Sequence, residues 1–469
     1  MLLIKGRLRW GLLLVASYYF YMSWRIDYIV LILISTVIDY IVTWLMDKTD
    51  NQRSRTFYLI ISLIVNLGLL FWFKYLAFFA ASTNQALMFI GVDGRLNVPA
   101  LLLPVGISFY TFQTLSYTVD VYQRKIKREP NFIIFALFVS YFPQLVAGPI
   151  ERSKDLLPQL RALQHKSLLH APDIAIGLRL MAWGMFKKIV VADRLALYVN
   201  PIYSDPDSFR GAAIILATIF FAFQIYCDFS GYSDIAIGAA RILGVKLSQN
   251  FNAPYFARSI ADFWQRWHIT LSTWFRDYLY IPLGGNRVSE WRWQLNIIIV
   301  FAVSGLWHGA SWTFIVWGLI HGIMYLINHY LVITLPSFDD SPAIFKRMIH
   351  IIQMIVIFVI VCIAWMFFRA ANLTDVITLM TNAIDFSNTG WQYPWQAINV
   401  ASSKLNIILC LAGMMIVIAV DALQEWIPSK WVMNAHIAPI RYIAYGFLLF
   451  AIAFFGLVGG EQQFVYFQF

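Results

Sequence analysis

The chain has 469 residues, of which 60% are hydrophobic and only 13% are charged, and its formal net charge is +10. This composition excludes a soluble globular domain. The positive charge does not indicate a nucleic-acid partner, because the basic residues concentrate in short loops between apolar stretches. The three cysteines, Cys227, Cys362 and Cys410, lie in apolar segments and suggest neither a disulfide framework nor a zinc site.

Apolar stretches of transmembrane length follow one another along most of the chain. A membrane-spanning helix needs about 20 mostly apolar residues. Candidate spans lie near residues 9–24, 27–46, 57–80, 98–118, 131–147, 172–196, 211–227, 294–317, 312–331, 349–368, 405–424 and 439–458. We therefore predict an all-helical integral membrane protein with about ten to thirteen transmembrane or re-entrant helices, which form one membrane domain over residues 1–469. In the first 130 residues, basic loops alternate with nearly uncharged ones, which predicts a cytoplasmic N-terminus.

Proline and glycine interrupt the apolar pattern at residues 103–106, 147–149 and 281–285. Irregular backbone at membrane depth is tolerated only where it is buried in protein or lines a wet cavity. We therefore expect these three connections to shape a cavity.

Residues 226–234 are unusually polar for their apolar surroundings and include Asp228 and Asp234. We expect this segment to end one span and to open the next helical run. Two interpretations stay open. The polar residues cap a helix start, or the carboxylates orient a histidine or a hydroxyl group of a substrate.

Residues 262–278 have the pattern of one amphipathic helix. Its aromatic and apolar residues recur at helical spacing, and its polar residues share another face. That polar strip consists of Gln265, His268, Ser272 and Arg276. The strip either faces water on an interfacial helix or offers imidazole, hydroxyl and guanidinium groups to a substrate.

His308 lies in an apolar window between Trp307 and Trp312. An imidazole at membrane depth is costly unless it has a partner or a function. The spacing of Gly305 and Gly309 is typical of close helix packing, so His308 either bonds across such a contact or takes a proton from an attacking hydroxyl group. We interpret His321, on the following apolar stretch, as a packing residue.

Four ordered runs, at residues 141–150, 226–234, 263–274 and 305–310, resemble the membrane-bound O-acyltransferases. The branch that they resemble most is the bacterial alginate O-acetyltransferase group, which is near the D-alanyl transferases of teichoic acids. The resemblance is dense from about residue 104 to 331, and residues 464–469 share it. Eight residues precede the run that begins at Arg9, where this branch usually has an additional apolar segment. Either this chain has one span fewer or its start lies downstream of the usual one.

The resemblance implies a ring of tilted helices around a central tunnel. His308 matches the catalytic histidine of the family, and His268 matches its second position, which is Asn or His. Around them we expect substrate or tunnel residues, and no metal. These are Gln265, Arg266, Trp267, Ser272, Trp274, Arg276, Asp228, Asp234, Trp307 and Trp312. Tyr466 either carries the acyl group as an ester or anchors the chain at the membrane interface.

The resemblance also implies substrates and partners. The acyl group, which we expect to be acetyl, comes from a cytoplasmic thioester, either acetyl-CoA or an acylated carrier protein, with no permanently bound cofactor. It passes across the bacterial inner membrane to an extracytoplasmic polysaccharide such as alginate, cellulose or peptidoglycan. An extracytoplasmic or membrane-anchored esterase-like protein often completes this transfer.

Two other functions stay open. One is D-alanyl transfer to teichoic acid, which the sequence barely distinguishes from acetyl transfer. The other is transport of a small solute or a lipid-linked sugar, because charged residues in apolar surroundings often mark ion or substrate paths. Those residues are Asp39, Lys74, Lys187, Lys188, Asp193, Arg369 and Asp421.

Overall fold

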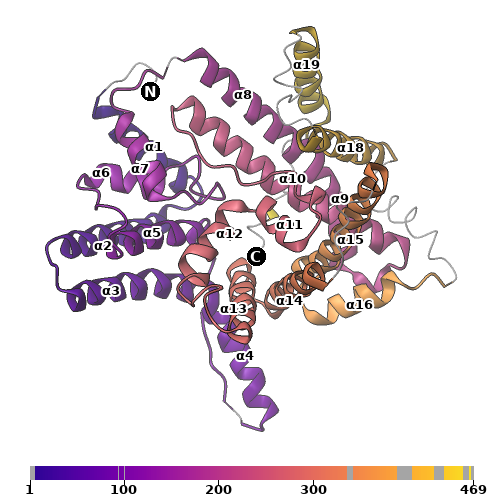
Figure 1. Ribbon diagram of the computed structural model, residues 1–469, viewed down its shortest axis with the longest axis horizontal. Helices are drawn as coiled ribbons and strands as arrows, with labels where there is room; N and C mark the ends of the chain where they lie inside the picture. The colour runs from indigo at the N-terminus through magenta and orange to yellow at the C-terminus, as the bar shows by residue number, and fades with distance from the viewer. Residues whose placement is uncertain are drawn as a thin grey trace. The chain divides into compact units, whose positions relative to one another are not determined.

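The computed structural model describes residues 6–92, 94–99, 101–168, 170–334, 342–387, 404–426, 438–457 and 464–465. Over these residues the chain forms helices, short 3₁₀ and π-helical turns and irregular connections, and no strand (Figure 1). The helices are α1 (Leu8–Met22), α2 (Ile29–Asp47), α3 (Gln52–Leu70), α4 (Leu76–Phe89), α5 (Ile107–Tyr122), α6 (Phe132–Ser140), α7 (Ser153–Ala162), α8 (Ala171–Met185), α9 (Asp193–Ser204), α10 (Ala212–Ile242), α11 (Ile260–Arg266), α12 (Ile269–Phe275), α13 (Glu290–His308), α14 (Trp312–Thr334), α15 (Ala343–Arg369), α16 (Leu373–Ala383), α18 (Lys404–Trp426) and α19 (Ala438–Phe455).

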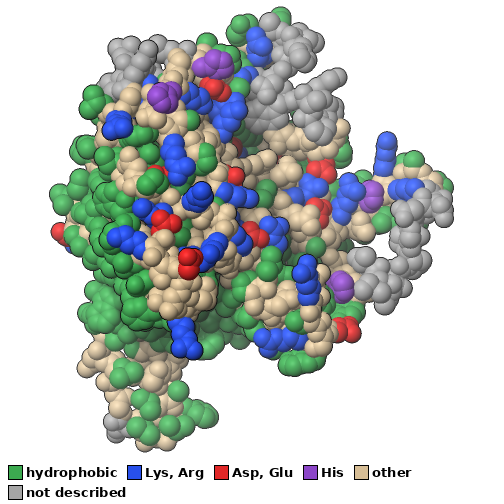
Figure 2. Space-filling model, turned by 60° about the vertical axis from the view of Figure 1, so that its left-hand side comes forward, with side chains coloured by type: hydrophobic (Ala, Val, Ile, Leu, Met, Phe, Trp, Pro, Cys, Tyr) green, Lys and Arg blue, Asp and Glu red, His purple; other side chains and the backbone are tan. Residues whose placement is uncertain are grey.

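Six helical stretches in the described part of the chain are long and apolar enough to cross a membrane. They are Ile26–Asp47, Gln52–Phe89, Ala212–Ile242, Trp312–Leu331, Ala343–Arg369 and Lys404–Trp426. Large hydrophobic side chains stay exposed on them, as at Ile352, Ile355 and Val359 of α15, and green side chains occupy broad areas of the face in Figure 2. Such surfaces suit contact with lipid chains rather than water. The predicted all-helical, multi-pass membrane fold is confirmed, whereas the total of ten to thirteen helices and their arrangement around a tunnel stay predictions.

The chain divides into two compact units. The first comprises Met1–Leu178 and Ala236–Ser248, and the second comprises Arg179–Ile235 and Gln249–Phe469. Each unit has its own cluster of buried hydrophobic side chains. Since α8 and α10 supply residues to both units, this grouping does not test the single membrane domain, which stays a prediction.

A buried polar network joins α2, α3 and α5 in the first unit. The carboxylate of Asp39 is fully buried and accepts hydrogen bonds from Ser62 Oγ at 2.5 Å and from Asn66 Nδ2 at 3.1 Å. The same asparagine accepts a hydrogen bond from Ser35 Oγ at 2.5 Å. Buried polar groups in helix contacts are stable when they are paired in this way. Asp39 therefore has a structural partner set within the helix bundle.

The hairpin of α13 and α14 brings His308 into the second unit. α13 ends at His308 and α14 begins at Trp312, so a predicted span over 294–317 is wrong and the chain turns between the two. A Cβ atom on Gly305 would overlap the carbonyl oxygen of Phe314, and one on Gly318 would overlap that of Phe301. The glycine spacing therefore serves close helix packing, as one interpretation of the sequence predicted.

The sequence predicted an interrupted helix at residues 226–234 and three irregular connections, and only the second prediction is correct. The segment 226–234 lies inside α10, which runs for 31 residues, so the predicted interruption of the helix there is wrong. The residues are buried against neighbouring helices, and their polar side chains bond to those neighbours instead of capping a helix end. The three connections at residues 103–106, 147–149 and 281–285 are irregular, as predicted.

Replacing Gly318 with Ala should destabilise the hairpin by about 1–3 kcal/mol, because the new methyl group meets backbone atoms that have no room to move. The measurement is the thermal unfolding midpoint of the purified protein in detergent. Gly446→Ala is the matched control, since a Cβ atom on that helical glycine meets nothing within 4 Å. Equal unfolding midpoints for the two variants would contradict the proposed close approach.

Candidate functional site

A break in helical geometry, within a continuous chain, separates α11 from α12. α11 ends at Arg266, α12 begins at Ile269, and the backbone of His268 is left-handed, with φ 43° and ψ 53°. A side chain on such a backbone is uncommon and needs support from its surroundings. The predicted single helix over 262–278 is therefore wrong, and His268 does not share a face with Gln265, Ser272 and Arg276.

Asn250 holds this break in place. Its backbone carbonyl accepts a hydrogen bond from Ile269 N at 3.0 Å. Its side-chain oxygen lies 3.3 Å from Thr270 N, 2.9 Å from Thr270 Oγ1 and 3.1 Å from His268 Nδ1. The sequence analysis missed Asn250, because a single asparagine 18 residues upstream carries no periodic or motif signal.

The structure brings His268 and His308 together. Their ring centroids lie 6.4 Å apart, and the side chains are 0% and 4% exposed. Burial lowers the pKa of His268 to about 3, so its imidazole is neutral at physiological pH. A neutral imidazole has a free lone pair, which is the form that acts as a base or as a hydrogen-bond acceptor.

Aromatic side chains enclose His308. The ring of Trp307 lies 4.9 Å away, that of Trp317 lies 5.0 Å away and that of Phe368 lies 5.4 Å away. Trp307 also lies 6.1 Å from His268, so it contacts both imidazoles. These rings exclude water from the immediate surroundings of His308.

A cavity of about 390 Å³ lies beside the histidines. It is lined by Gln265, Ser272 and Arg276, which are three of the four residues of the predicted polar strip. Ser304, one helical turn before His308, lines it as well, but neither histidine ring does. The structure thus places a mainly apolar cavity with a few polar side chains one turn from His308, and a tunnel that reaches the ring stays a prediction.

The two aspartates of α10 pair with lysines. Asp228 lies 2.7 Å from Lys188 Nζ and accepts a hydrogen bond from Val465 N at 2.7 Å. Asp234 lies 2.6 Å from Lys187 Nζ. The described contacts pair both carboxylates with lysines, and a role in orienting a histidine or a substrate hydroxyl group stays a prediction.

The other charged residues in apolar surroundings also have partners within the chain. Lys188 bridges Asp228 to Asp193, at 2.8 Å from the latter. Asp421 accepts a hydrogen bond from Tyr226 Oη at 2.8 Å, and Arg369 donates one to Asn200 at 2.9 Å. Lys74 lies 3.4 Å from Ser108 Oγ. Such pairing gives these residues a structural role in helix contacts, which does not require an ion path.

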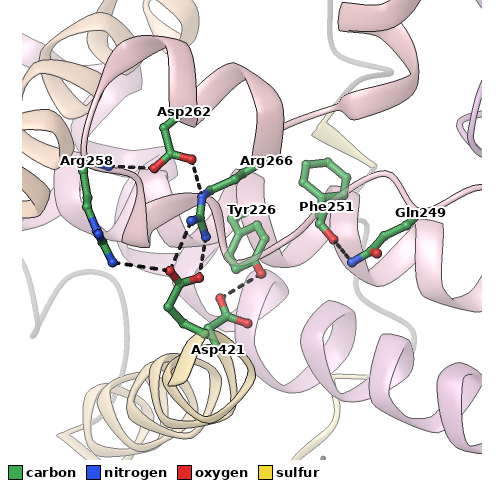
Figure 3. A network of polar contacts seen from close by, with 8 residues as sticks. Tyr226, Gln249, Phe251, Arg258, Asp262, Arg266 and Asp421 are labelled. Carbon is green, nitrogen blue, oxygen red and sulfur yellow. Dashed lines mark hydrogen bonds and ion pairs between the residues drawn. The ribbon is translucent and has the colours of Figure 1, made fainter. Parts of the chain in front are cut away.

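Arg266 ends α11 in an ion-pair network (Figure 3). Two of its guanidinium nitrogens contact Glu425 at 2.5 and 3.1 Å, and a third contacts Asp262 at 2.6 Å. A two-pronged arginine–carboxylate pair is geometrically specific. It fastens the end of α11 to α18, so Arg266 positions the chain directly before the break.

The remaining predicted residues differ in burial. Trp267 is fully buried and stacks on Phe263 at 5.6 Å, and Trp274 is 9% exposed. Trp312 is 51% exposed at the start of α14, and its place along a tunnel stays a prediction. His321 is buried and stacks on Phe263 at 6.0 Å, which agrees with a packing role. Tyr466 lies outside the described residues.

The sequence that carries these two buried histidines is similar to sequences of known proteins. Residues 13–369 match the model of MBOAT, the membrane-bound O-acyltransferase family. The chain belongs to the membrane-bound O-acyltransferase family. As a member it is an acyltransferase, and both His268 and His308 lie within the matched residues.

Individual family members are also similar over most of the chain. A peptidoglycan O-acetyltransferase of Helicobacter pylori is 36% identical over 397 residues, which cover 79% of this chain and 73% of that protein. A probable alginate O-acetylase AlgI of Azotobacter vinelandii is 40% identical over 393 residues, 83% and 75% of the two chains. A teichoic acid D-alanyltransferase of Streptococcus thermophilus is 29% identical over 255 residues, 52% and 61% of the two chains.

Replacing Lys188 with Met should destabilise the protein by about 3–5 kcal/mol, because Asp193 and Asp228 would stay buried without their shared cation. The measurement is thermal unfolding in detergent. Lys404→Met, at an exposed lysine, is the control. The double variant Lys188→Met with Asp228→Asn should recover part of the loss, since it removes one uncompensated charge. An unchanged unfolding midpoint in Lys188→Met would refute the structural role of the pairs.

Proposed function

We propose that this protein moves an acetyl group from a cytoplasmic thioester to an acceptor hydroxyl group, for O-acetylation of an extracytoplasmic polysaccharide. The observation that carries the proposal is the pair of buried imidazoles, 6.4 Å apart, inside the part of the chain that matches the family. The names of the relatives at 36–40% identity support acetyl transfer to alginate or peptidoglycan. Cellulose is a third acceptor of the same chemistry.

In the proposed reaction, His308 is the general base. One of its ring nitrogens takes the proton of the acceptor hydroxyl while the hydroxyl oxygen attacks the thioester carbonyl carbon. The new C–O bond forms, the C–S bond breaks, and the leaving thiolate takes the proton back from the imidazolium. Assistance of this kind typically contributes about a hundredfold to ten-thousandfold in rate. The aromatic rings around His308 keep out water that would hydrolyse the thioester.

The cavity beside the histidines supplies the polar groups for binding. We assign Gln265, Ser272 and Arg276 to contacts with the donor or the acceptor, since they line one cavity that approaches His308 through Ser304. A cationic guanidinium and neutral hydrogen-bonding groups suit a thioester donor that also carries phosphate. Acetyl-CoA and an acylated carrier protein both have this chemistry.

Location and partners follow from the transfer across a bilayer. We place the protein in the bacterial inner membrane, where a cytoplasmic donor meets an extracytoplasmic acceptor. An esterase-like partner on the outer side completes the transfer to the polymer. The multi-pass helices support such a path through the membrane.

D-alanyl transfer to teichoic acid is the second candidate. Its support is the match to teichoic acid D-alanyltransferases, which covers 52% of this chain at 29% identity. The acetyl-transferring relatives match about four-fifths of the chain at higher identity, which favours acetyl transfer. A neighbouring gene pair for a D-alanine ligase and its carrier protein would favour the second candidate.

Replacing His308 with Ala should abolish acylation, because no other described group takes the hydroxyl proton at this position, while expression stays normal. His268→Ala should reduce acylation strongly. The measurement is mass analysis of acyl esters on surface and periplasmic glycans from a deletion strain complemented with each variant. His165→Ala, at an exposed histidine, is the control. Full acylation in the His308→Ala strain would overturn the assignment of the base.

Replacing Tyr466 with Phe separates the two roles of that residue. If its phenol carries the acyl group as an ester, polymer acylation should fall to the level of the deletion strain, because phenylalanine offers no oxygen for the ester. If Tyr466 anchors the chain at the interface, the aromatic ring of Phe should preserve acylation. The same glycan analysis distinguishes the two results.

A further inference from the structure

We propose that Asn250 is a positioning residue that holds His268 in its Nδ1–H tautomer, so that Nε2 accepts hydrogen bonds and does not donate them. The kinetic part of this inference rests on the proposed acetyl transfer. The tautomer itself does not, because it follows from contacts within the chain.

The orientation of the Asn250 amide is decided by Thr270. The backbone nitrogen of Thr270 lies 3.3 Å from the side-chain oxygen of Asn250. A backbone N–H group only donates, so the amide atom that faces it has to be the acceptor oxygen. The hydroxyl group of Thr270 donates to the same oxygen at 2.9 Å. The amide nitrogen faces Ser233 Oγ at 3.5 Å.

The orientation of the amide then decides the proton of His268. Nδ1 of His268 lies 3.1 Å from the same acceptor oxygen, so Nδ1 carries a hydrogen and donates it. A neutral imidazole has one N–H group, and the proton on Nδ1 leaves the lone pair on Nε2. The ring of Phe229 meets the imidazole of His268 edge-on, with 4.7 Å between ring centroids and 84° between ring planes. His268 is fully buried, and burial disfavours a second proton on its imidazole.

This tautomer selects between two roles for His268. Polarising the thioester carbonyl requires a hydrogen-bond donor, and the only N–H group of the ring is engaged by Asn250. Accepting a hydrogen bond from a hydroxyl group of the acceptor requires a lone pair, which Nε2 has. His268 therefore binds and orients a hydroxyl group of the acceptor, while His308 takes the proton.

The left-handed backbone of His268 makes Asn250 necessary. With φ at 43°, the residue departs from helical geometry directly before the start of α12. The hydrogen bonds from Ile269 N and Thr270 to Asn250 fix the start of α12, and the bond from Nδ1 fixes the ring relative to that start. Asn250 thus holds both the backbone at the start of α12 and the imidazole of His268.

The tautomer is tested by ¹⁵N NMR of the full-length protein with ¹⁵N-labelled histidine, purified in detergent. The signal of His268 is assigned by its loss in His268→Gln. In the wild type we expect a protonated Nδ1 and an unprotonated Nε2, and Asn250→Asp should keep this pattern because it keeps the acceptor oxygen. Asn250→Leu should shift the population toward the Nε2–H form. A wild-type spectrum with a protonated Nε2, or an Asn250→Leu spectrum equal to the wild type, overturns the inference.

The kinetic consequence is tested with radiolabelled acetyl-CoA and membrane vesicles that contain the polysaccharide of the host. Asn250→Leu should lower kcat at least about tenfold, as loss of an imidazole's orienting partner typically does, with an unchanged KM for acetyl-CoA. Asn250→Asp should retain activity. Thr270→Val is the matched control, since it removes one bond to the same oxygen and leaves the imidazole bond in place.

The NMR test and the kinetic test fail independently, and each failure has its own meaning. A higher KM with unchanged kcat in Asn250→Leu contradicts the positioning role and assigns Asn250 to donor binding. A wild type that transfers no label from acetyl-CoA or from an acetylated carrier protein contradicts the proposed acetyl transfer, and the NMR pattern still decides the tautomer. A Thr270→Val variant as inactive as Asn250→Leu would show that the loop alone matters, which also overturns the inference.

Discussion

The acceptor oxygen of Asn250 receives the three donors that set the geometry around His268. Without this anchor, a continuous helix would carry His268 on the same face as Gln265 and Ser272, which line the cavity. The ion pairs of Arg266 with Glu425 hold the other side of the same break. Two polar anchors therefore keep a short stretch of backbone in a conformation that a side-chain-bearing residue rarely adopts.

Buried charges in this protein stabilise helix contacts. Lys187 and Lys188 lie in a π-helical segment, Phe186–Ala192, and pair with carboxylates from α9 and α10. One of these carboxylates also accepts the backbone N–H group of Val465, so the pair reaches the described part of the C-terminal segment. Charged residues in apolar segments suggested a transport path, but their described contacts join neighbouring segments within each unit.

Aromatic packing gives the two imidazoles a shared environment. Trp307 contacts both rings, and Trp317 connects His308 to His321 through ring contacts of 5.0 Å on each side. A dry, aromatic surrounding suits a base that acts on a hydroxyl group and excludes competing water. The cavity lined in part by Gln265 and Ser272 adds polar groups that can bind a substrate. A buried base, the exclusion of water and these polar groups together support the acyl transfer that we propose.

The sequence by itself determined the membrane class, the family, the close packing at Gly305, and the two candidate histidines. These features depend on composition, on local spacing or on long ordered runs, which are visible along the chain. Only the tertiary structure decided the break at His268, the continuity of α10 through residues 226–234, and the lysine partners of Asp228 and Asp234. Each depends on a residue that is distant in sequence, as Asn250 is from His268. Helical periodicity assumes that every residue follows the same backbone geometry, so it does not register a single left-handed residue that a distant side chain stabilises.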